Sequence, residues 1–205
     1  MNEAYIYIVF SATPYRIGKM IRRVTKETYN HISIALDAEL CEMYGFARRY
    51  YRLPLYGGFV KESLARYHLK QDSAQLCVCR IPVTQLQYQR LKEQLSSMYR
   101  QRDLYIYNHL SALGALFRKP VKVKRAYTCV EFCTQVLYEL GIHINPAQYH
   151  SVCDVLELLK SYMIYTGPAP VFTGTDPTFF AKKPVTFPVL ITLRELCKLI
   201  PRLDR

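Results

Sequence analysis

The sequence predicts an α+β fold in which a mixed or antiparallel sheet is flanked by helices. Residues 30–36 alternate polar and apolar side chains, which is the pattern of a half-buried strand. Residues 84–100 repeat leucine and methionine at helical spacing, as an amphipathic helix does. Half of the 205 residues are apolar and a fifth are charged, which suits one globular domain and excludes a disordered chain.

The first part of the chain carries mainly strand signals. The tyrosine-rich apolar run at 4–11 predicts a buried strand, and Pro14 follows its end. Residues 15–26 place apolar side chains on one side of a basic amphipathic helix. The two apolar segments 30–36 and 40–46 are separated by a short acidic turn, so we expect them to form a hairpin.

The middle of the chain changes from strand to helix signals. The basic, aromatic and glycine-containing stretch 48–58 predicts a loop, and alternation predicts a strand at 75–82. The helix at 84–100 follows, and we expect a shorter helix at 106–117.

Residues 129–140 predict a helix with a well-defined start. Thr128 and Glu131 form a T-x-x-E capping box, which makes Cys129 the first helical residue, and Gly141 ends the apolar stripe. A thiol at this position faces unpaired backbone N–H groups and the positive end of the helix dipole, which favour a thiolate. The basic residues upstream, at 118–125, add to this effect.

The C-terminal part predicts an appendage to a single catalytic domain. A capped amphipathic helix is expected at 151–162, and the five prolines of 165–188 predict an ordered loop or a partial edge strand. A last short helix is expected at 192–199. We therefore divide the chain into a catalytic domain, 1–163, and a proline-rich arm with a short helix, 164–205, that packs on it.

Charge and cysteine content restrict the partners and the compartment. The net charge of +12 favours an anionic partner. Seven cysteines, an odd number without metal-type spacing, indicate reduced thiols in a cytoplasmic protein that uses no metal or cofactor. The N-terminal run has no basic region, so we expect a first strand there and not a signal peptide, and no stretch is long and apolar enough for a membrane span.

His31 is the best partner for Cys129, because it alone among the five histidines begins a strand that leads into a second strand. An imidazole beside the thiol can take its proton and later protonate a leaving group. If the hairpin pairs Leu36 with Cys41, then Glu42 and Tyr44 share the face of His31, and we name both as candidates for orienting the ring. A one-residue shift in register would replace them with other side chains.

Two motifs carry a resemblance to a known family. His31-Ile32-Ser33-Ile34 with the following hairpin, and Cys129-Val130-Glu131-Phe132 at a helix start, resemble the circularly permuted papain-like hydrolases of the NlpC superfamily, nearest to the bacterial YiiX and YaeF amidases. The resemblance implies a mixed sheet flanked by helices, with cysteine as nucleophile and histidine as base.

We therefore expect a thiol hydrolase, an amidase or peptidase, that attacks an amide or ester carbonyl in a peptide, amide or acyl substrate of possibly anionic character. The residues expected to contact this substrate are Ser11, Thr13, Arg48 and Tyr127. Two alternatives remain. One is an acyltransferase of related permuted fold that acts on lipid. The other is a non-catalytic basic module that binds nucleic acid or another polyanion; it is less favoured because the basic residues are scattered over at least three segments.

Overall fold

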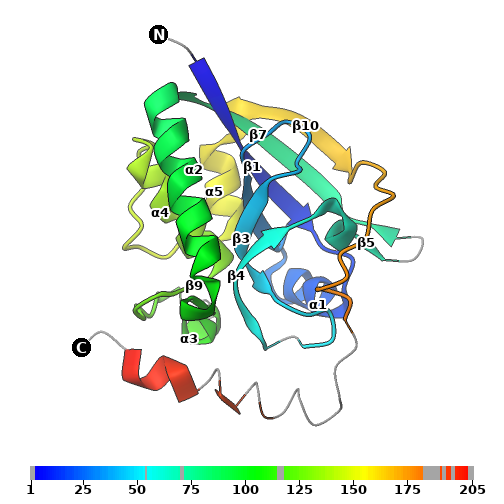
Figure 1. Ribbon diagram of the computed structural model, residues 1–205, viewed down its shortest axis with the longest axis vertical. Coiled ribbons are helices and arrows are strands. Elements are labelled where there is room, and N and C mark those ends of the chain that lie inside the picture. Colours follow the sequence, from blue (N-terminus) through cyan, green and yellow to red (C-terminus); the bar gives the residue numbers. More distant parts are fainter. Residues whose placement is uncertain are drawn as a thin grey trace.

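A computed structural model of the chain describes residues 3–53, 55–69, 72–114, 118–181, 190, 193–194 and 197–202. It confirms an α+β architecture in which helices flank a mixed sheet (Figure 1). The sheet has eight strands in the order β10-β7-β1-β2-β3-β4-β8-β9. Every neighbouring pair is antiparallel except β8 and β9, which are parallel.

The strands of this sheet are β1 (Glu3–Ala12), β2 (His31–Ala35), β3 (Met43–Arg48), β4 (Gly57–Glu62), β7 (Gln75–Thr84), β8 (Ile106–Tyr107), β9 (Ala126–Tyr127) and β10 (Met163–Pro168). A separate two-stranded sheet is formed by β5 (His68–Leu69) and β6 (Asp72–Ser73). The helices are α1 (Arg16–Thr25), α2 (Gln85–Arg100), α3 (His109–Gly114), α4 (Cys129–Glu139) and α5 (Val152–Leu158).

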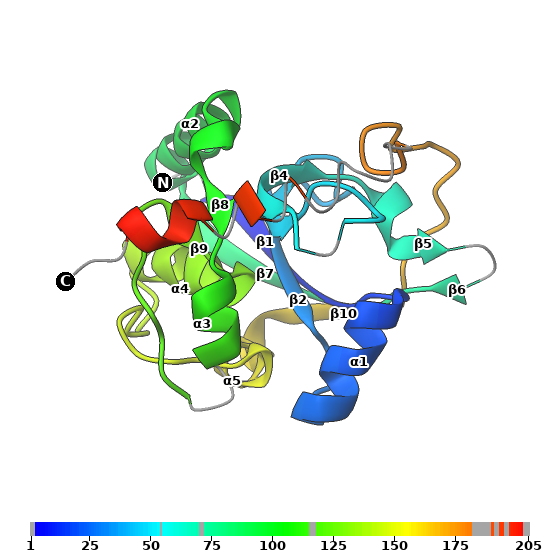
Figure 2. The ribbon, with the colours of Figure 1, turned by 90° about the horizontal axis from the view of Figure 1, so that it is seen from below.

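The main core lies between one face of the sheet and three of the helices. Apolar side chains of α2, α4 and α5 pack together against β1, β2, β3 and β7, and Figure 1 shows these helices on one side of the sheet. A second apolar cluster covers the opposite face. Figure 2 shows α1 and α3 on either side of the end of β2.

Two predicted segments, the loop at 48–58 and the helix at 106–117, differ from the observed secondary structure because each contains a short strand. The expected loop at 48–58 runs into β4, a strand whose buried run is too short to stand out in the sequence. The expected helix at 106–117 begins instead as β8 and continues as α3, and residues 115–117 lie outside the described chain.

The start of the proline-rich stretch is also regular. Residues 163–168 form β10, which pairs with β7 at the edge of the sheet, where Pro168 costs no interior ladder bond. Within the expected helix at 192–199, the structure describes only 193–194 and 197–199, and these residues are helical. Pro184 and Pro188 lie outside the described residues.

An aromatic cluster joins β3, β4 and α4. The ring centroid of Phe46 lies 5.5 Å from that of Phe59, 5.3 Å from that of Phe132 and 5.2 Å from that of Tyr127. Phe46 and Phe59 are fully buried. Since aromatic pairs at such separations add to ordinary burial, this cluster holds the first turn of α4 against the sheet.

Replacing Phe46 by alanine tests this role. We expect Phe46→Ala to lower the free energy of unfolding by about 3–5 kcal/mol, because the substitution leaves a cavity among rigid rings. The matched control is Phe172→Ala, whose side chain is 38 % exposed, and it should change stability by no more than about 0.5 kcal/mol. Urea unfolding measures both, and equal effects would contradict the assignment.

Candidate active site

The Cys129 thiol lies at the start of α4, as the sequence predicted. Both halves of the capping box are present: the Glu131 backbone N–H donates to Thr128 Oγ1 at 3.1 Å, and the Thr128 N–H donates to Glu131 Oε2 at 2.7 Å. The second Glu131 oxygen accepts a hydrogen bond from Ser111 of α3. The helix start is therefore anchored to α3, and Cys129 is held in place with only 6 % of its surface exposed.

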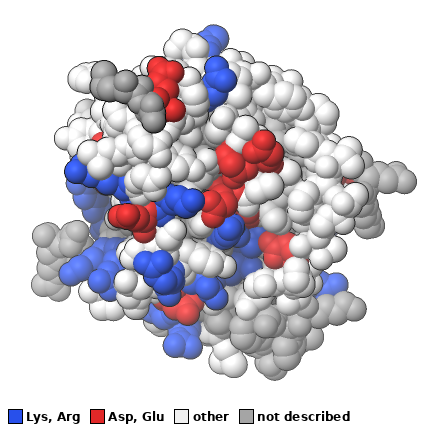
Figure 3. Space-filling model, turned by 45° about the horizontal axis from the view of Figure 1, so that its top comes forward, with Lys and Arg blue, Asp and Glu red and all other residues white. Residues whose placement is uncertain are grey.

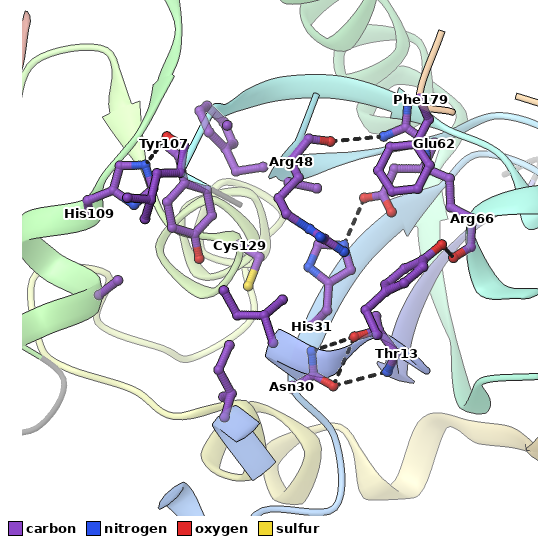
Figure 4. A pocket seen from close by; sticks show the side chains of 18 of the residues that line it. Thr13, Asn30, His31, Arg48, Glu62, Arg66, Tyr107, His109, Cys129 and Phe179 are labelled. Carbon is purple, nitrogen blue, oxygen red and sulfur yellow. Dashed lines mark hydrogen bonds and ion pairs between the residues drawn. The ribbon is translucent and has the colours of Figure 1, made fainter. Parts of the chain in front are cut away.

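His31 begins β2 and is buried beside Cys129. Both side chains line the same cavity, the neighbouring Cys129 contributes to the raised pKa of His31, and Figure 4 shows the sulfur and the imidazole on facing elements. The Nε2 atom of His31 lies 2.9 Å from Glu62 Oε1. Because Nε2 faces the carboxylate, Nδ1 is the nitrogen left for the thiol.

Glu62, the last residue of β4, is the group that orients the imidazole. Its carboxylate is 3 % exposed and accepts hydrogen bonds from Ser33 at 2.8 Å and from the Tyr67 hydroxyl at 3.0 Å, in addition to His31. A buried carboxylate is stable only when it is paired and hydrogen-bonded, and these three contacts meet that requirement.

Glu62 reaches His31 because Gly45 lies between their strands. Gly45 of β3 is the residue opposite Val60 of β4, and a β-carbon built on Gly45 would lie 2.8 Å from Glu62 Oε1. Any larger residue would occupy the space of the carboxylate oxygen. The absence of a side chain on the central strand is therefore a condition for this contact.

The prediction that Glu42 or Tyr44 orients the His31 ring was wrong. The hairpin pairs Ile34 with Tyr44 and Ala35 with Met43, a register one residue away from the one that pairs Leu36 with Cys41. The shift turns Tyr44 to the other face, where its ring stacks on Phe59 at 6.0 Å. The Tyr44 hydroxyl instead donates to Glu42 at 3.5 Å, and Lys61 pairs with the same carboxylate.

The electrostatics of the pair favour a charged imidazole. Burial lowers the pKa of His31, but the Glu62 charge, the hydrogen bond that the ring donates to Glu62 and the neighbouring Cys129 outweigh burial and raise it to about 10. Burial raises the pKa of Glu62, while the His31 charge and hydrogen bond lower it to about 2. At neutral pH the site therefore holds an imidazolium and a carboxylate in contact.

Cys129 and His31 line a cavity of about 210 Å³ that opens between α1 and α3. Its walls are largely apolar, and Tyr107 of β8 lines it together with Cys129. Burial and the nearby Cys129 and Glu131 hold the pKa of Tyr107 well above its ordinary value, so the hydroxyl remains a donor. Beside a sulfur, an imidazolium can give a proton to a leaving group, and a phenol can donate a hydrogen bond to a neighbouring oxyanion.

Of the four expected substrate contacts, the structure brings two to this cavity. Thr13 and Arg48 line it. Ser11 pairs with His31 across β1 and β2, and it is fully buried behind the cavity wall. Tyr127 belongs to the aromatic cluster with Phe46, so packing and not substrate contact accounts for its position.

Sequence reasoning missed Glu62, Tyr67 and Tyr107. Glu62 carries a weak signal, an acidic residue two positions after the short apolar pair Phe59-Val60, just beyond the segment 48–58 that we expected to be a loop. Tyr107 lies in a two-residue strand, and nothing in the local sequence distinguishes it from the other seventeen tyrosines.

Comparison with known proteins found no matching family model, no matching curated protein and no matching solved structure. In the described part of the chain, no helix has the length and apolar character needed to cross a membrane. Among the same residues, no three histidine, cysteine or acidic side chains are grouped to hold a metal ion. The site is therefore interpreted from its own geometry.

Removing the charge of Glu62 tests the electrostatic arrangement. In Glu62→Gln we expect the pKa of His31 to fall from about 10 to below its ordinary 6.5, because burial then acts without a counter-charge. NMR titration of the histidine ring protons measures it. Since the folded protein binds this proton more tightly than the unfolded chain does, wild-type stability should decrease as pH rises from 6.5 through about 10. A His31 pKa unchanged in Glu62→Gln would contradict the pairing.

A methyl group at Gly45 tests the space that the carboxylate needs. We expect Gly45→Ala to lower the pKa of His31 and to destabilise the protein by about 1–3 kcal/mol, although alanine normally stabilises a strand relative to glycine. In a Glu62→Ala background the clash is gone, so the same substitution should cost nothing. A double-mutant cycle by urea unfolding measures the coupling, and additive effects would refute it.

Proposed function

We propose that the protein is a cysteine hydrolase that cleaves an amide or ester carbonyl through an acyl-enzyme on Cys129. The observation that carries this proposal is the contact between Cys129 at the start of α4 and the buried His31, which Glu62 holds by Nε2. An inert core cysteine needs no such partner. Cys133, one turn further along α4, illustrates the contrast, because burial raises its pKa and it packs within the main core.

The first half of the proposed reaction forms the acyl-enzyme. In the proposed starting state Cys129 is a thiolate beside the His31 imidazolium. The thiolate sulfur attacks the carbonyl carbon, a C–S bond forms, and the carbonyl oxygen becomes an oxyanion. The Cys129 backbone N–H and the Tyr107 hydroxyl are the donors available to it. The imidazolium of His31 then gives its proton to the departing nitrogen or oxygen as the bond to the leaving group breaks.

The second half releases the acid. His31, now neutral, takes a proton from a water molecule, and the hydroxide attacks the thioester carbon. A C–O bond forms, the C–S bond breaks, and the sulfur leaves as the thiolate beside the imidazolium. Glu62 remains ionised throughout and stabilises the charge on His31 in both halves.

The order of the elements supports a permuted papain-like fold for this chemistry. The histidine strand β2 precedes the cysteine helix α4 in sequence, the helix packs on the sheet, and a carboxylate takes the place of the orienting polar group. These features agree with the resemblance of the two motifs to the permuted NlpC-type hydrolases.

Acyl transfer is a second candidate, favoured by one observation. The cavity walls beside Cys129 include Ile17 and Ile21 of α1 together with Leu55, which would suit an apolar acyl chain. The acyl-enzyme is common to both reactions, and only the acceptor differs. Product analysis with and without an added alcohol or amine separates them.

The charge distribution gives less support to a polyanion-binding module. On the face seen in Figure 3, acidic side chains divide the basic ones. Several arginines are also committed to internal contacts: Arg49 pairs with Asp103 at 2.6 Å, and Arg66 with Asp176 at 2.6 Å. These arginines could bind the phosphates of a nucleic acid only if their ion pairs with Asp103 and Asp176 were broken.

Acylation by a chromogenic ester tests the proposal. With 4-nitrophenyl butyrate we expect release of nitrophenolate and a butyryl adduct on Cys129, found by peptide mass spectrometry. Cys129→Ala should abolish both, and His31→Ala should slow acylation at pH 7 by at least about 100-fold, the usual contribution of a general acid–base group.

The exposed Cys41 provides the matched control, because Cys41→Ala removes a thiol that has no part in the site. It should leave the rate and the adduct unchanged. An adduct that forms on Cys41 as readily as on Cys129, or a rate insensitive to His31→Ala, would overturn the proposal.

A further inference from the structure

Arg48 is a charged side chain of the cavity wall that takes no part in the proposed reaction. Arg48 ends β3, is half-buried, and shares the cavity wall with His31 and Cys129. Figure 4 shows its side chain directed toward the imidazole side of the cavity. A cation in this position bears directly on which substrates can be bound.

The charge of Arg48 has no acidic partner among the described residues. Its guanidinium lies 4.7 Å from the ring centroid of Tyr15, and its Nη1 donates to the carbonyl oxygen of Tyr51 at 3.0 Å. The nearby Asp176 carboxylate pairs with Arg66 and not with Arg48. Among the described residues, the charge of Arg48 is therefore not balanced by a carboxylate. Burial, with a smaller contribution from Arg66, lowers the pKa of Arg48.

The free edge of the guanidinium has the geometry of a carboxylate receptor. Nε and Nη2 of Arg48 have no hydrogen-bond partner in the part of the chain that the structure describes. This pair of N–H donors forms the fork that binds two carboxylate oxygens at once. The ring of Tyr15 below the guanidinium keeps the fork in one orientation.

We infer that Arg48 binds a carboxylate of the substrate, so that the protein acts on amides or esters that carry a carboxylate near the scissile carbonyl. This inference rests on the proposed function, because it places the carboxylate relative to the Cys129 nucleophile. The apolar wall formed by Ile17, Ile21 and Leu55 then accommodates the uncharged part of the same substrate.

Two thiol reagents of nearly equal size test the inference without knowledge of the natural substrate. Iodoacetate and iodoacetamide both form a C–S bond with Cys129 and release iodide, and they differ in a carboxylate against a carboxamide. The quantity measured is the rate of Cys129 alkylation by iodoacetate divided by the rate with iodoacetamide, read by peptide mass spectrometry at pH 7. In Arg48→Gln we expect this ratio to fall about tenfold, the effect of losing one charge-assisted hydrogen-bonded contact.

Two further variants separate a local contact from general electrostatics. Arg48→Lys keeps the charge but lacks the two-donor fork, so it should restore only part of the ratio that Arg48→Gln loses. Arg23→Gln removes an equal charge from the exposed side of α1, outside the cavity, and should leave the ratio unchanged. An unchanged ratio in Arg48→Gln, or an equal fall in Arg23→Gln, would overturn the inference.

A protection experiment on the wild-type protein keeps the test independent of whether the variants fold. Butyrate should slow alkylation of Cys129 by iodoacetamide more than butyramide does at the same concentration, and equal protection would overturn the inference. The outcome is distinct from failure of the proposed function: if His31→Ala leaves the reactivity of Cys129 unaltered, the hydrolase proposal fails, whatever the ratio of the two reagents.

Discussion

The buried ion pair between His31 and Glu62 is the interaction on which the site depends. Both side chains are almost completely shielded from water, and their atoms approach to 2.9 Å. Removing two charges from water is costly, and mutual attraction offsets that cost only when the remaining hydrogen-bonding capacity is also used. Ser33 and Tyr67 meet this condition by donating to the carboxylate. The pair is thus a closed network that holds the imidazole in one orientation beside Cys129.

This network constrains the sheet around it. Its members come from β2, from the end of β4 and from the segment after β4, so the central strand β3 must pass between them without a side chain at Gly45. On the opposite face, the ring of Phe46 holds β3 against α4. Strand β3 therefore has two requirements: no side chain at position 45, which faces the carboxylate, and a large ring at position 46, which faces the helix that bears Cys129.

The cavity adds a chemical asymmetry to this rigid centre. Its reactive floor is polar and charged, with Cys129, His31 and Tyr107, while the side toward α1 is apolar. Arg48 lies on the imidazole side of the same cavity (Figure 4). Such an arrangement orients a substrate by its ends, because each part of the ligand has one favourable environment. The proposed acyl chemistry and the proposed carboxylate contact both follow from that single geometry.

The sequence by itself determined the elements that local chemistry specifies: the capped start of α4 with Cys129 at its first position, the strand beginning at His31, and the long helix α2. Only the tertiary structure decided which carboxylate meets His31. A one-residue change in hairpin register exchanges the two faces of a strand, and the local pattern at 40–46 does not distinguish the two registers. Glu62 and Tyr107 lie in short strands whose place depends on pairing with distant partners, so their role arises from long-range packing that no local periodicity records.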